Sequence, residues 1–440
     1  MGKAAPFTLI RPDCAGIDLG SERHYVAVPE DRCDSEISNF GCYTADLRAM
    51  GDWLLSLGIR DVAMEATGVY WIPVYEALAS RGLRVTLVDA RSAKSLSGRK
   101  TDVEDCQWIR NLHMYGLLKS CVVPEAQILV LRSYWRQRDR LVQQRSEQIQ
   151  LMHKALEQMN IQLHKALSDV TGVSGMAIIR AILAGERDPK VLSELLVHRA
   201  RLKKDLVEKA LEGRWADHHL FALEEAVATY DFLGSRLQSC DRKLEEEMCK
   251  LGGGKVGTKR PSNASKNAPN FDLKPRIKDL LGVDPTVIDG VEASTAAVLV
   301  CELGTDLSKF KTKKHLGSYL GLAPQNKITG GNIKSSKTKK VRHPAANALR
   351  LAAQSLHSSG TAMGAFYRRL CARIGPAKAT TACARKIAEA YYDLVVHGIV
   401  YQDIGEQAYN ERFRDQRIRR LRKQAGKYGM CLVEEPAMTT

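Results

Sequence analysis

The sequence predicts a mixed α/β domain at its N-terminal end, a long helical region in the middle and a basic, mainly helical domain at its C-terminal end. Three observations support this division. Short apolar runs alternate with amphipathic segments over the first hundred residues. Apolar residues then recur every three or four positions over two long stretches. Finally, residues 301–440 contain 25 Lys and Arg against 10 Asp and Glu, whereas the whole 440-residue chain contains 66 against 50.

The composition is that of a globular chain with a polyanionic partner. Apolar residues make up 44% and charged residues 26%, which excludes a disordered or collagen-like chain. The longest apolar stretches are far shorter than the roughly 18 residues of a membrane-spanning helix, and the eleven cysteines include no C-x-x-C pair. We therefore expect a soluble, cytoplasmic protein without membrane contact, disulfide framework or structural zinc. Its net charge of +16 favours nucleic acid as the partner.

The first 122 residues form the predicted α/β domain. Short apolar or alternating runs predict four strands, over residues 14–19, 25–29, 62–66 and 83–88. Amphipathic spacing predicts three helices, over residues 44–57, 72–82 and 101–117. Because the first two strands read as a hairpin and the later ones alternate with helices, the order predicts a mixed sheet.

Residues 123–251 are expected to be helical and to contain a coiled coil. Apolar seams of heptad type run over residues 128–170 and 220–251, and the first seam is interrupted by Arg138 and Arg145. Such seams pair within one chain, pair between subunits or form the ordinary core faces of a helical domain. The sequence does not choose among these three arrangements.

The remaining residues divide into three predicted segments. Residues 252–275 are rich in Gly, Pro, Ser, Asn and Lys, which predicts a flexible linker. Residues 276–400 form the mainly α C-terminal domain, in which residues 287–300 resemble a helix-hairpin-helix that points backbone N–H groups at a phosphate. Residues 401–440 form a basic helical tail.

Four carboxylates have the pattern of a metal site. Asp18 ends an apolar strand next to a glycine turn, and Glu65 is the only charge in a strand otherwise suited to burial. Asp102 and Asp105 lie three residues apart at the start of a helix and so share a face, unlike Glu104. Such a group is able to bind two Mg²⁺ or Mn²⁺ ions and act on a phosphodiester. Each acid also has an ordinary alternative, such as favouring a helix N-terminus.

Two basic clusters flank a Gly-Gly turn and are candidates for phosphate contact. They comprise Lys309, Lys311, Lys313 and Lys314, followed by Lys334, Lys337, Lys339, Lys340 and Arg342. Between them Thr329 directly precedes the two glycines, so its hydroxyl is sterically open, and Ser335 and Ser336 follow. The ordinary alternatives are a solvated charged face and a plain turn residue.

These motifs resemble those of a known family. The runs Gly-Ile-Asp-Leu-Gly, Met-Glu-Ala-Thr-Gly, Lys-Thr-Asp-x-x-Asp and Leu-Gly-Leu-Ala-Pro-x-Asn-x-x-Thr-Gly-Gly are similar to those of the DEDD insertion-sequence transposases, which include the Piv-type DNA invertases. The resemblance covers residues 14–167 and 285–370. It implies an RNase H-like (RuvC-like) domain, a coiled coil and a C-terminal transposase domain. It also implies a bacterial, nucleoid-associated protein and a noncoding bridge RNA that pairs with donor and target DNA.

Position by position, the resemblance assigns metal binding to Asp18, Glu65, Asp102 and Asp105. The nucleophile of the family is a serine immediately before a glycine, which forms a covalent link to DNA. Thr329 occupies that position here and offers the same hydroxyl, although its extra methyl group crowds the attack. Ser335 and Ser336 are the possible substitutes.

We therefore expect a transposase or site-specific recombinase that works as a homo-oligomer, a dimer or a tetramer. The predicted linker and seams suggest that the basic domain of one subunit reaches the acidic site of another. One alternative is an RNase H-like nuclease or Holliday-junction resolvase that uses water, which forms no covalent protein–DNA adduct. A second alternative is a non-enzymatic nucleic-acid-binding assembly protein, for which recombination would survive joint replacement of Asp102 and Asp105 by asparagine.

Overall fold

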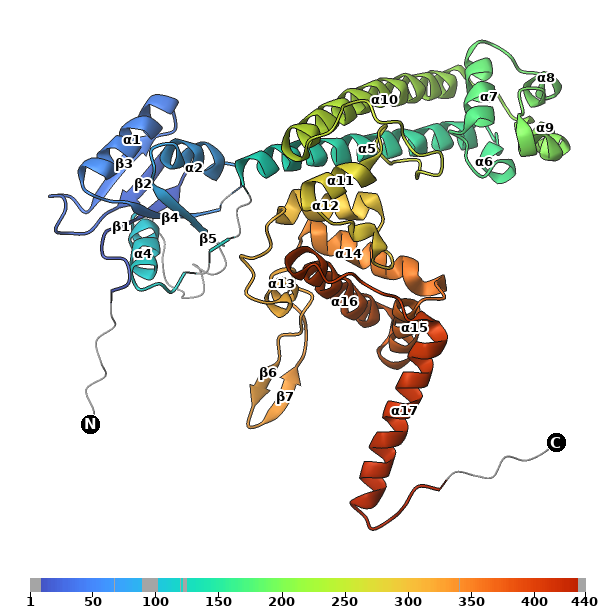
Figure 1. Cartoon of the computed structure of the whole chain (residues 1–440). Helices are drawn as coiled ribbons and strands as arrows, with labels where there is room; N and C mark the ends of the chain where they lie inside the picture. Colours follow the sequence, from blue (N-terminus) through green and yellow to red (C-terminus); the bar gives the residue numbers. More distant parts are fainter. Residues whose placement is uncertain are drawn as a thin grey trace. The chain divides into compact units, whose positions relative to one another are not determined.

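The computed structural model describes residues 9–66, 68–88, 102–118, 120–121, 125–339 and 341–433 (Figure 1). The chain divides into two compact units, residues 1–123 and residues 124–440. The boundary between the units lies one residue beyond the end of the predicted N-terminal segment. All later segments of the prediction fall within the second unit.

The first unit is a five-stranded mixed sheet with helices on both faces. Its elements are β1 (Cys14–Leu19), β2 (Arg23–Ala27), β3 (Ile37–Gly41), α1 (Thr44–Ser56), β4 (Asp61–Glu65), α2 (Trp71–Ala79), β5 (Arg84–Val88) and α4 (Asp102–Met114). The strand order is β3-β2-β1-β4-β5. β1, β2 and β3 pair antiparallel, whereas β4 is parallel to both β1 and β5.

Alternation along the strands separates the two faces of this sheet. Ile17 of β1 and Met64 of β4 are fully buried and belong to one apolar core with Met50 of α1 and Leu78 of α2. Because successive strand residues point to opposite faces, the neighbours of Ile17 and Met64 point away from this core. That opposite face is covered by α4, which contacts β1, β2 and β4.

The mixed sheet and its four predicted strands are confirmed. The sequence did not predict β3, which has four half-buried residues and one exposed residue and includes two polar side chains. As the outer neighbour of β2, it is an edge strand and carries little of the apolar alternation that marks a strand in a sequence.

The second unit begins with helices that form a long hairpin and a small tip. These are α5 (Ala126–Gln158), α6 (Leu163–Ala166), α7 (Val173–Leu183), α8 (Pro189–Ser193), a 3₁₀ helix (His198–Lys203), α9 (Lys204–Leu211) and α10 (Asp217–Gly252). The first predicted seam is shorter than expected, because α5 ends at Gln158 and Asn160 takes a positive φ of 57°. Residues beyond this point turn into the tip.

The two long helices α5 and α10 pack against each other within the chain and run in opposite directions (Figure 1). Arg138, which interrupts the apolar seam, forms a buried ion pair with Asp241 at 2.6 Å between Nε and Oδ1. One heptad further on, the guanidinium of Arg145 lies 4.0 Å from the centre of the Tyr230 ring. Leaving one partner of a buried ion pair uncompensated costs about 3–5 kcal/mol, so Arg138 and Asp241 fix the register of the hairpin.

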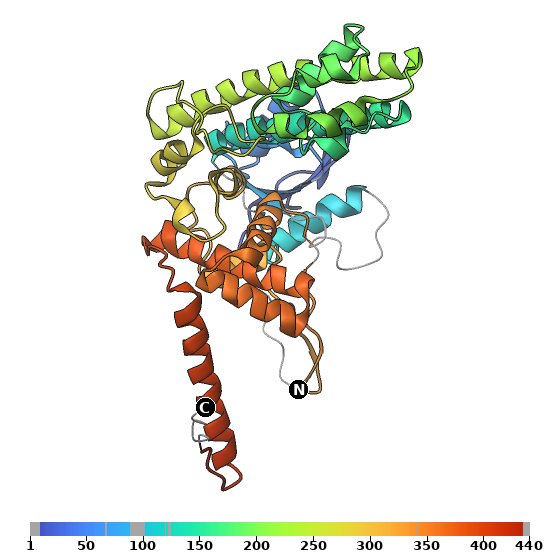
Figure 2. The same cartoon turned by 90° about the vertical axis from the view of Figure 1, so that its right-hand side faces the viewer.

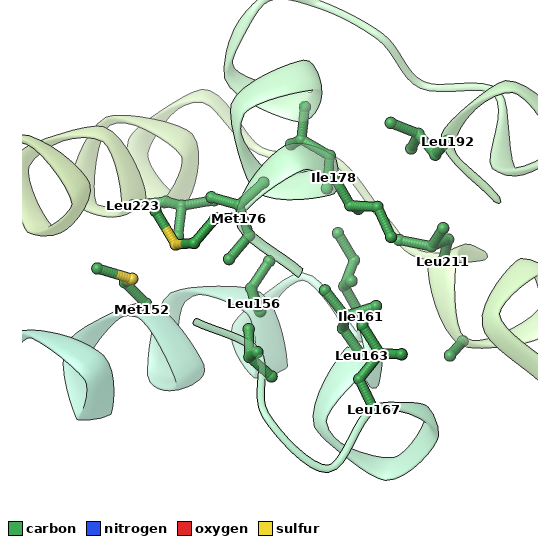
Figure 3. Packing of buried hydrophobic residues seen from close by; sticks show 14 of the residues in the cluster. Met152, Leu156, Ile161, Leu163, Leu167, Met176, Ile178, Leu192, Leu211 and Leu223 are labelled. Carbon is green, nitrogen blue, oxygen red and sulfur yellow. The ribbon is translucent and has the colours of Figure 1, made fainter. Parts of the chain in front are cut away.

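The tip of the hairpin has its own apolar core, shown in Figure 3. Met152 and Leu156 at the end of α5 pack with Met176 of α7, Leu211 of α9 and Leu223 of α10, and all five side chains are at most 7% exposed. The helices of the tip are short, so burial against α5 and α10 rather than intrinsic propensity stabilises them.

The segment that the composition predicts as a linker lies along α10. Glu245 of α10 accepts hydrogen bonds from the backbone N–H groups of Gly257 (3.0 Å) and Thr258 (2.9 Å). Asp241 accepts one from the backbone of Asn270 at 2.9 Å, and Phe271 is only 3% exposed. Polar and small residues here satisfy a buried carboxylate, which composition alone does not reveal.

The rest of the second unit is mainly helical. It contains α11 (Leu273–Leu281), a 3₁₀ helix (Pro285–Val287), α12 (Ala293–Leu303), α13 (Lys313–Tyr319), β6 (Lys327–Thr329), β7 (Asn332–Ser335), α14 (Pro344–Ser355), a 3₁₀ helix (Leu356–Ser358), α15 (Ala362–Ile374), α16 (Pro376–His397) and α17 (Gly405–Gly426). α12, α13 and α15 pack around α14 and α16. The expectation of a mainly α C-terminal part is confirmed.

A buried carboxylate joins these helices to α5. Glu302 at the end of α12 is 3% exposed, and Arg136 of α5 donates to both of its oxygens at 2.8 Å. Arg132, one turn earlier on α5, donates to the backbone carbonyls of Cys301 (3.0 Å) and Glu302 (2.9 Å). Bidentate arginine–carboxylate pairs are among the stronger polar contacts in proteins, so α5 and α12 are firmly connected.

All eleven cysteines are free thiols, and five of them are buried. Burial raises the pKa of the Cys14 and Cys106 thiols to about 11. These side chains therefore stay protonated near neutral pH and pack as small apolar groups. Within the described ranges, no helix combines the length and apolar character needed to span a membrane.

Candidate catalytic site

Asp18 and Glu65 lie at the ends of two neighbouring parallel strands. Ile17 of β1 is the register partner of Met64 of β4, so Asp18 and Glu65 are the next residues of the two strands. Side chains at matched positions of paired strands share a face of the sheet. Asp18 is half-buried and Glu65 is 9% exposed. Both carboxylates consequently point to the face that α4 covers.

A single glycine sets the distance between this face and α4. Gly16, two residues before Asp18, lies so close to α4 that a Cβ atom there would be 2.3 Å from the backbone nitrogen of Arg110 and from the carbonyl oxygen of Cys106. Real Cβ atoms do not approach backbone atoms so closely. Glycine is thus required for α4 to lie directly on β1.

Asp105 lies in the first turns of α4, the helix that covers this face of the sheet. It directly precedes Cys106, and the Asp18 carboxylate adds to the effect of burial in raising the pKa of the Cys106 thiol. Asp18 is therefore close to the first turns of α4, where Asp105 is half-buried and Glu104 is exposed. Asp102 is the first residue of α4, but its side chain lies outside the described part of the chain.

Polar contacts fix α4 over the sheet beyond these carboxylates. Arg110, 8% exposed, donates through Nη1 to the backbone carbonyl of Val28. Gln107 donates through Nε2 to Glu36 at 3.0 Å. These contacts were not expected from the sequence, because they join residues more than seventy positions apart.

The donor set of the predicted acidic site suits a hard cation. Asp18, Glu65 and Asp105 offer only carboxylate oxygens, the ligands that Mg²⁺ and Mn²⁺ prefer. Among the side chains that the structure describes, however, no three His, Cys, Asp or Glu form a group that is able to hold a metal ion. The fourth predicted ligand, Asp102, is not among those side chains.

Thr329 lies at the end of an exposed β-hairpin in the second unit. We call this hairpin, β6 with β7, the β-arm; it makes few contacts with other elements. Thr329 pairs with Asn332 across Gly330 and Gly331, whose φ values are +57° and +78°. A two-residue turn with positive φ at both positions is the usual hairpin connection and favours glycine strongly. The turn leaves Thr329 exposed beside the tip.

Two family models match the chain at the parts that carry these residues. One, described as a transposase of the DEDD type, matches residues 15–161, which include Asp18, Glu65, Asp102 and Asp105. The other, described as the transposase IS116/IS110/IS902 family, matches residues 286–368, which include the β-arm. Together they cover just over half of the chain. This chain belongs to the DEDD-type insertion-sequence transposases.

Transposases of this kind are enzymes that bind, cut and rejoin DNA, and the DEDD family generally uses divalent metal ions. A search among curated proteins found no match to the chain. The assignment rests on the two family models alone. It agrees with the resemblance that the motifs of the sequence indicated.

The second basic cluster of the transposase surrounds the β-arm. Its described members Lys334, Lys337, Lys339 and Arg342 are all exposed, whereas Lys340 lies outside the described residues. Lys327 at the start of β6 is also exposed but was not among the predicted candidates. Its pairing with Ser335 across the hairpin, which the sequence spacing does not reveal, brings it into the cluster.

The two substitute hydroxyls differ in their surroundings. Ser335 is half-buried at the end of β7, and its Oγ accepts a long hydrogen bond from the backbone of Lys337 at 3.4 Å. Ser336 is exposed just beyond the strand. Neither serine stands beside the glycine turn, in contrast to Thr329.

The first basic cluster of the transposase has a partly structural role. Lys313 is paired with Asp393 of α16 at 2.6 Å, which connects α13 to α16. Burial lowers the pKa of Lys309. Lys311 and Lys314 are exposed. The sequence predicted phosphate contact for all four lysines without distinguishing the paired one.

The predicted helix-hairpin-helix differs from the expectation in its first half. A 3₁₀ helix of three residues precedes the turn at Gly290, and α12 follows it. A Cβ atom on Gly290 would be 2.6 Å from the carbonyl oxygen of Ala352, so this turn packs closely on α14. Asp289 accepts a hydrogen bond from the hydroxyl of Tyr401 at 2.7 Å.

His113 at the far end of α4 predicts a pH-dependent stability for the first unit. Burial, with a smaller contribution from Arg11 and against the effect of Asp61, lowers the pKa of His113 from 6.5 to about 4. In the unfolded chain His113 therefore becomes protonated below pH 6.5, whereas in the folded chain it stays neutral until about pH 4. The neutral, buried His113 therefore contributes to the free energy of unfolding. Its contribution is fully present above pH 6.5 and decreases by about 3 kcal/mol as the pH falls to 4.

Urea unfolding between pH 7 and pH 4 measures this effect. In the His113→Leu variant, the loss of stability over this range should be smaller than in the natural chain by about 3 kcal/mol. Replacing the exposed His218 by leucine serves as the control and should leave the slope unchanged. Equal pH dependence of the natural and His113→Leu chains would contradict the prediction.

Proposed function

We propose that this transposase recombines the DNA of a mobile element by using Asp18, Glu65, Asp102 and Asp105 as its acidic site and the hydroxyl of Thr329 as its nucleophile. The observation that carries the proposal is that Asp18 and Glu65 lie at matched ends of the adjacent parallel strands β1 and β4, on the face of the sheet that α4 covers. Two carboxylates at neighbouring strand ends are not explained by stability, because each adds negative charge beside the other.

The proposal includes an RNase H-like fold for the first unit. The strand order β3-β2-β1-β4-β5, with an antiparallel meander on one side and parallel strands on the other, supports it. The acids then lie at the carboxyl ends of adjacent parallel strands, where open α/β sheets commonly bind their ligands.

The acidic side chains hold Mg²⁺ or Mn²⁺ in this proposal, and such an ion would supply positive charge to the oxygens of a reacting phosphodiester. The sheet and α4 keep Asp18, Glu65 and Asp105 in place for that purpose, since Gly16 and Arg110 fix the helix on β1. Exact replacement of one carboxylate by its amide would leave this framework intact.

Thr329 carries the covalent step. Its hydroxyl oxygen bonds to phosphorus and gives its proton to solvent, while the bond from phosphorus to a sugar oxygen breaks and that oxygen takes up a proton. One phosphoester bond replaces another, so the broken strand is rejoined by the reverse step without an energy source. The exposed position of Thr329 beside the Gly330–Gly331 turn supports this role.

A noncoding bridge RNA would choose the donor and target DNA. The excess of basic residues after position 301 supports the binding of more than one polyanion. We further propose a dimer or tetramer in which the β-arm of one subunit serves the acidic site of another. Guidance by RNA and the sharing of a site between subunits are each independent of which residues carry out the cleavage.

Recombination between purified components tests the proposal. The chain should co-purify with RNA transcribed from its own element, and nuclease treatment should abolish recombination of donor and target plasmids. Adding back the RNA made in vitro should restore it, whereas an RNA of scrambled sequence should not. Undiminished recombination after complete removal of RNA would disprove guidance by RNA and leave the assignment of the acidic site standing.

A further inference from the structure

Helix α17 differs from the other long helices of the second unit, α5, α10 and α16, because none of its residues is buried. It extends from the C-terminal helices in both views (Figures 1 and 2). At about 1.5 Å per residue its 22 residues span about 33 Å. An isolated helix without an apolar face needs another reason to be present.

The first part of α17 is attached to α15. The guanidinium of Arg369 lies 3.7 Å from the centre of the Phe413 ring and 5.2 Å from that of Tyr409. Arg368 forms an ion pair with Glu406 at 2.7 Å. These contacts all involve residues up to 413, and Asp415, Gln416 and Arg419 border a pocket with Arg369. The first part of the helix is thus a fixed base from which the second part extends.

Charge is divided along α17 in the same way. Residues 405–413 contain two acidic residues and one arginine, whereas residues 414–426 contain one aspartate and six basic residues. These six are Arg414, Arg417, Arg419, Arg420, Arg422 and Lys423, and all are exposed. Within residues 9–433 as far as they are described, Arg414, Arg417, Arg419 and Arg420 have no ion-pair partner.

The positive charge surrounds the helix instead of marking one side. Arg417 and Arg419 are two residues apart, as are Arg420 and Arg422, and such a spacing places side chains about 200° apart around an α-helix. Only about half of these basic side chains would be able to contact a single flat anionic surface. A partner with phosphates on both sides of the helix would meet them all.

We propose that residues 414–426 of α17 bind duplex DNA by lying in its major groove. This groove is about 12 Å wide and is bordered by phosphates on both sides, and an α-helix is about 10–12 Å across. The major groove of duplex RNA is too deep and narrow to admit a helix, which favours DNA over the guide RNA. Continuous basic helices bind DNA in this manner.

This inference deepens the proposed function, because it adds a second DNA contact to a DNA-recombining enzyme, but its site is separate. α17 lies outside both matched family segments, 15–161 and 286–368. It also requires no cleavage. Equilibrium binding without divalent metal therefore tests it independently of the acidic site and of Thr329.

The test uses the full chain and a labelled 30-base-pair DNA of arbitrary sequence in fluorescence anisotropy at several salt concentrations. The variant replaces Arg414, Arg417, Arg419 and Arg420 by glutamine, which has a similar helix propensity. We expect about hundredfold weaker binding at 0.15 M NaCl and a slope of log K against log salt that is shallower by about 3 to 4. Circular dichroism should show unchanged helix content.

Three comparisons make the result decisive. A control variant loses the same charge at the exposed Lys154, Lys165, Lys209 and Arg214 of the hairpin tip and its connections, and it should bind DNA within about threefold of the natural chain. A duplex RNA of the same sequence should bind the α17 variant within about threefold of the natural chain. An Asp18→Asn chain should bind DNA normally, whatever its activity.

The proposal is overturned if the α17 variant retains normal DNA affinity and salt slope. It is equally overturned if the control variant loses as much affinity, since general charge would then explain binding. Equal losses for duplex DNA and duplex RNA would also reject it, because a helix in the major groove cannot treat the two alike.

Discussion

Replacing Asp18 by asparagine will reduce DNA cleavage and recombination by about a thousandfold while DNA binding is retained. Asparagine has nearly the same shape, so β1 and its contacts with α4 should persist. The loss of a charged ligand oxygen removes several kcal/mol of transition-state stabilisation, and each 1.36 kcal/mol is a factor of ten in rate. Glu65→Gln and Asp105→Asn should have comparable effects, measured as strand cleavage of a labelled donor DNA in Mg²⁺.

Glu104 provides the matched control for this prediction. It is an exposed carboxylate on the same turn of α4 as Asp105, and the sequence pattern excluded it from the acidic site. Glu104→Gln should cleave within about threefold of the natural rate, because an exposed charge contributes little at this range. An active Asp18→Asn chain, or a Glu104→Gln chain as inactive as Asp105→Asn, would show that the site has been assigned wrongly.

Replacing Thr329 by valine will abolish the covalent protein–DNA adduct. Valine keeps the shape and the strand preference of threonine but has no hydroxyl, so β6 should form as before. Thr329→Ser keeps the hydroxyl and removes the crowding methyl group, and it should form the adduct at least as fast as the natural chain. Denaturing gel electrophoresis of the chain with radiolabelled donor DNA detects the adduct directly.

Ser335 and Ser336 decide between the remaining possibilities. Ser335→Ala and Ser336→Ala should form the adduct normally. If Thr329→Val retains it and Ser335→Ala loses it, the nucleophile is Ser335 and our assignment is wrong. If cleavage proceeds without any adduct in the natural chain, the enzyme uses water, as in the nuclease or resolvase alternative. Mixed Asp18→Ala and Thr329→Ala chains that fail to restore recombination would contradict a site shared between subunits.

The antiparallel pairing of α5 with α10 could have been predicted from the residues that interrupt their apolar seams, but we did not predict it. Arg138 and Arg145 interrupt one seam seven residues apart, and Gly234 and Asp241 interrupt the other at the same interval. Only an antiparallel alignment matches Arg138 with Asp241 and brings Arg145 beside Gly234, as the structure has it. Apolar periodicity alone is satisfied by several pairings, whereas a buried charge accepts few partners.

The positions in the fold of the predicted acidic residues could be predicted in part. Strand ends indicated Asp18 and Glu65, and helical spacing indicated that Asp102 and Asp105 share a face. No pattern in the sequence indicated that α4 lies on the Asp18 side of the sheet. That placement depends on Gly16, whose missing side chain is recognised only when the helix backbone is seen above it. The hydrogen-bond partners of Glu245 could not be predicted either, because Gly257 and Thr258 occur in a segment of linker composition.

The contact between Glu302 and α5 has a practical consequence for dissecting this enzyme. A fragment that begins at residue 276 would retain Glu302 but lack Arg132 and Arg136, its partners on α5. The carboxylate would then be left in an apolar interior without compensation, or the fragment would open to hydrate it. The helical hairpin and the C-terminal helices should accordingly unfold in a single cooperative transition, and the boundary that composition suggests between them is not a place where the chain can be divided.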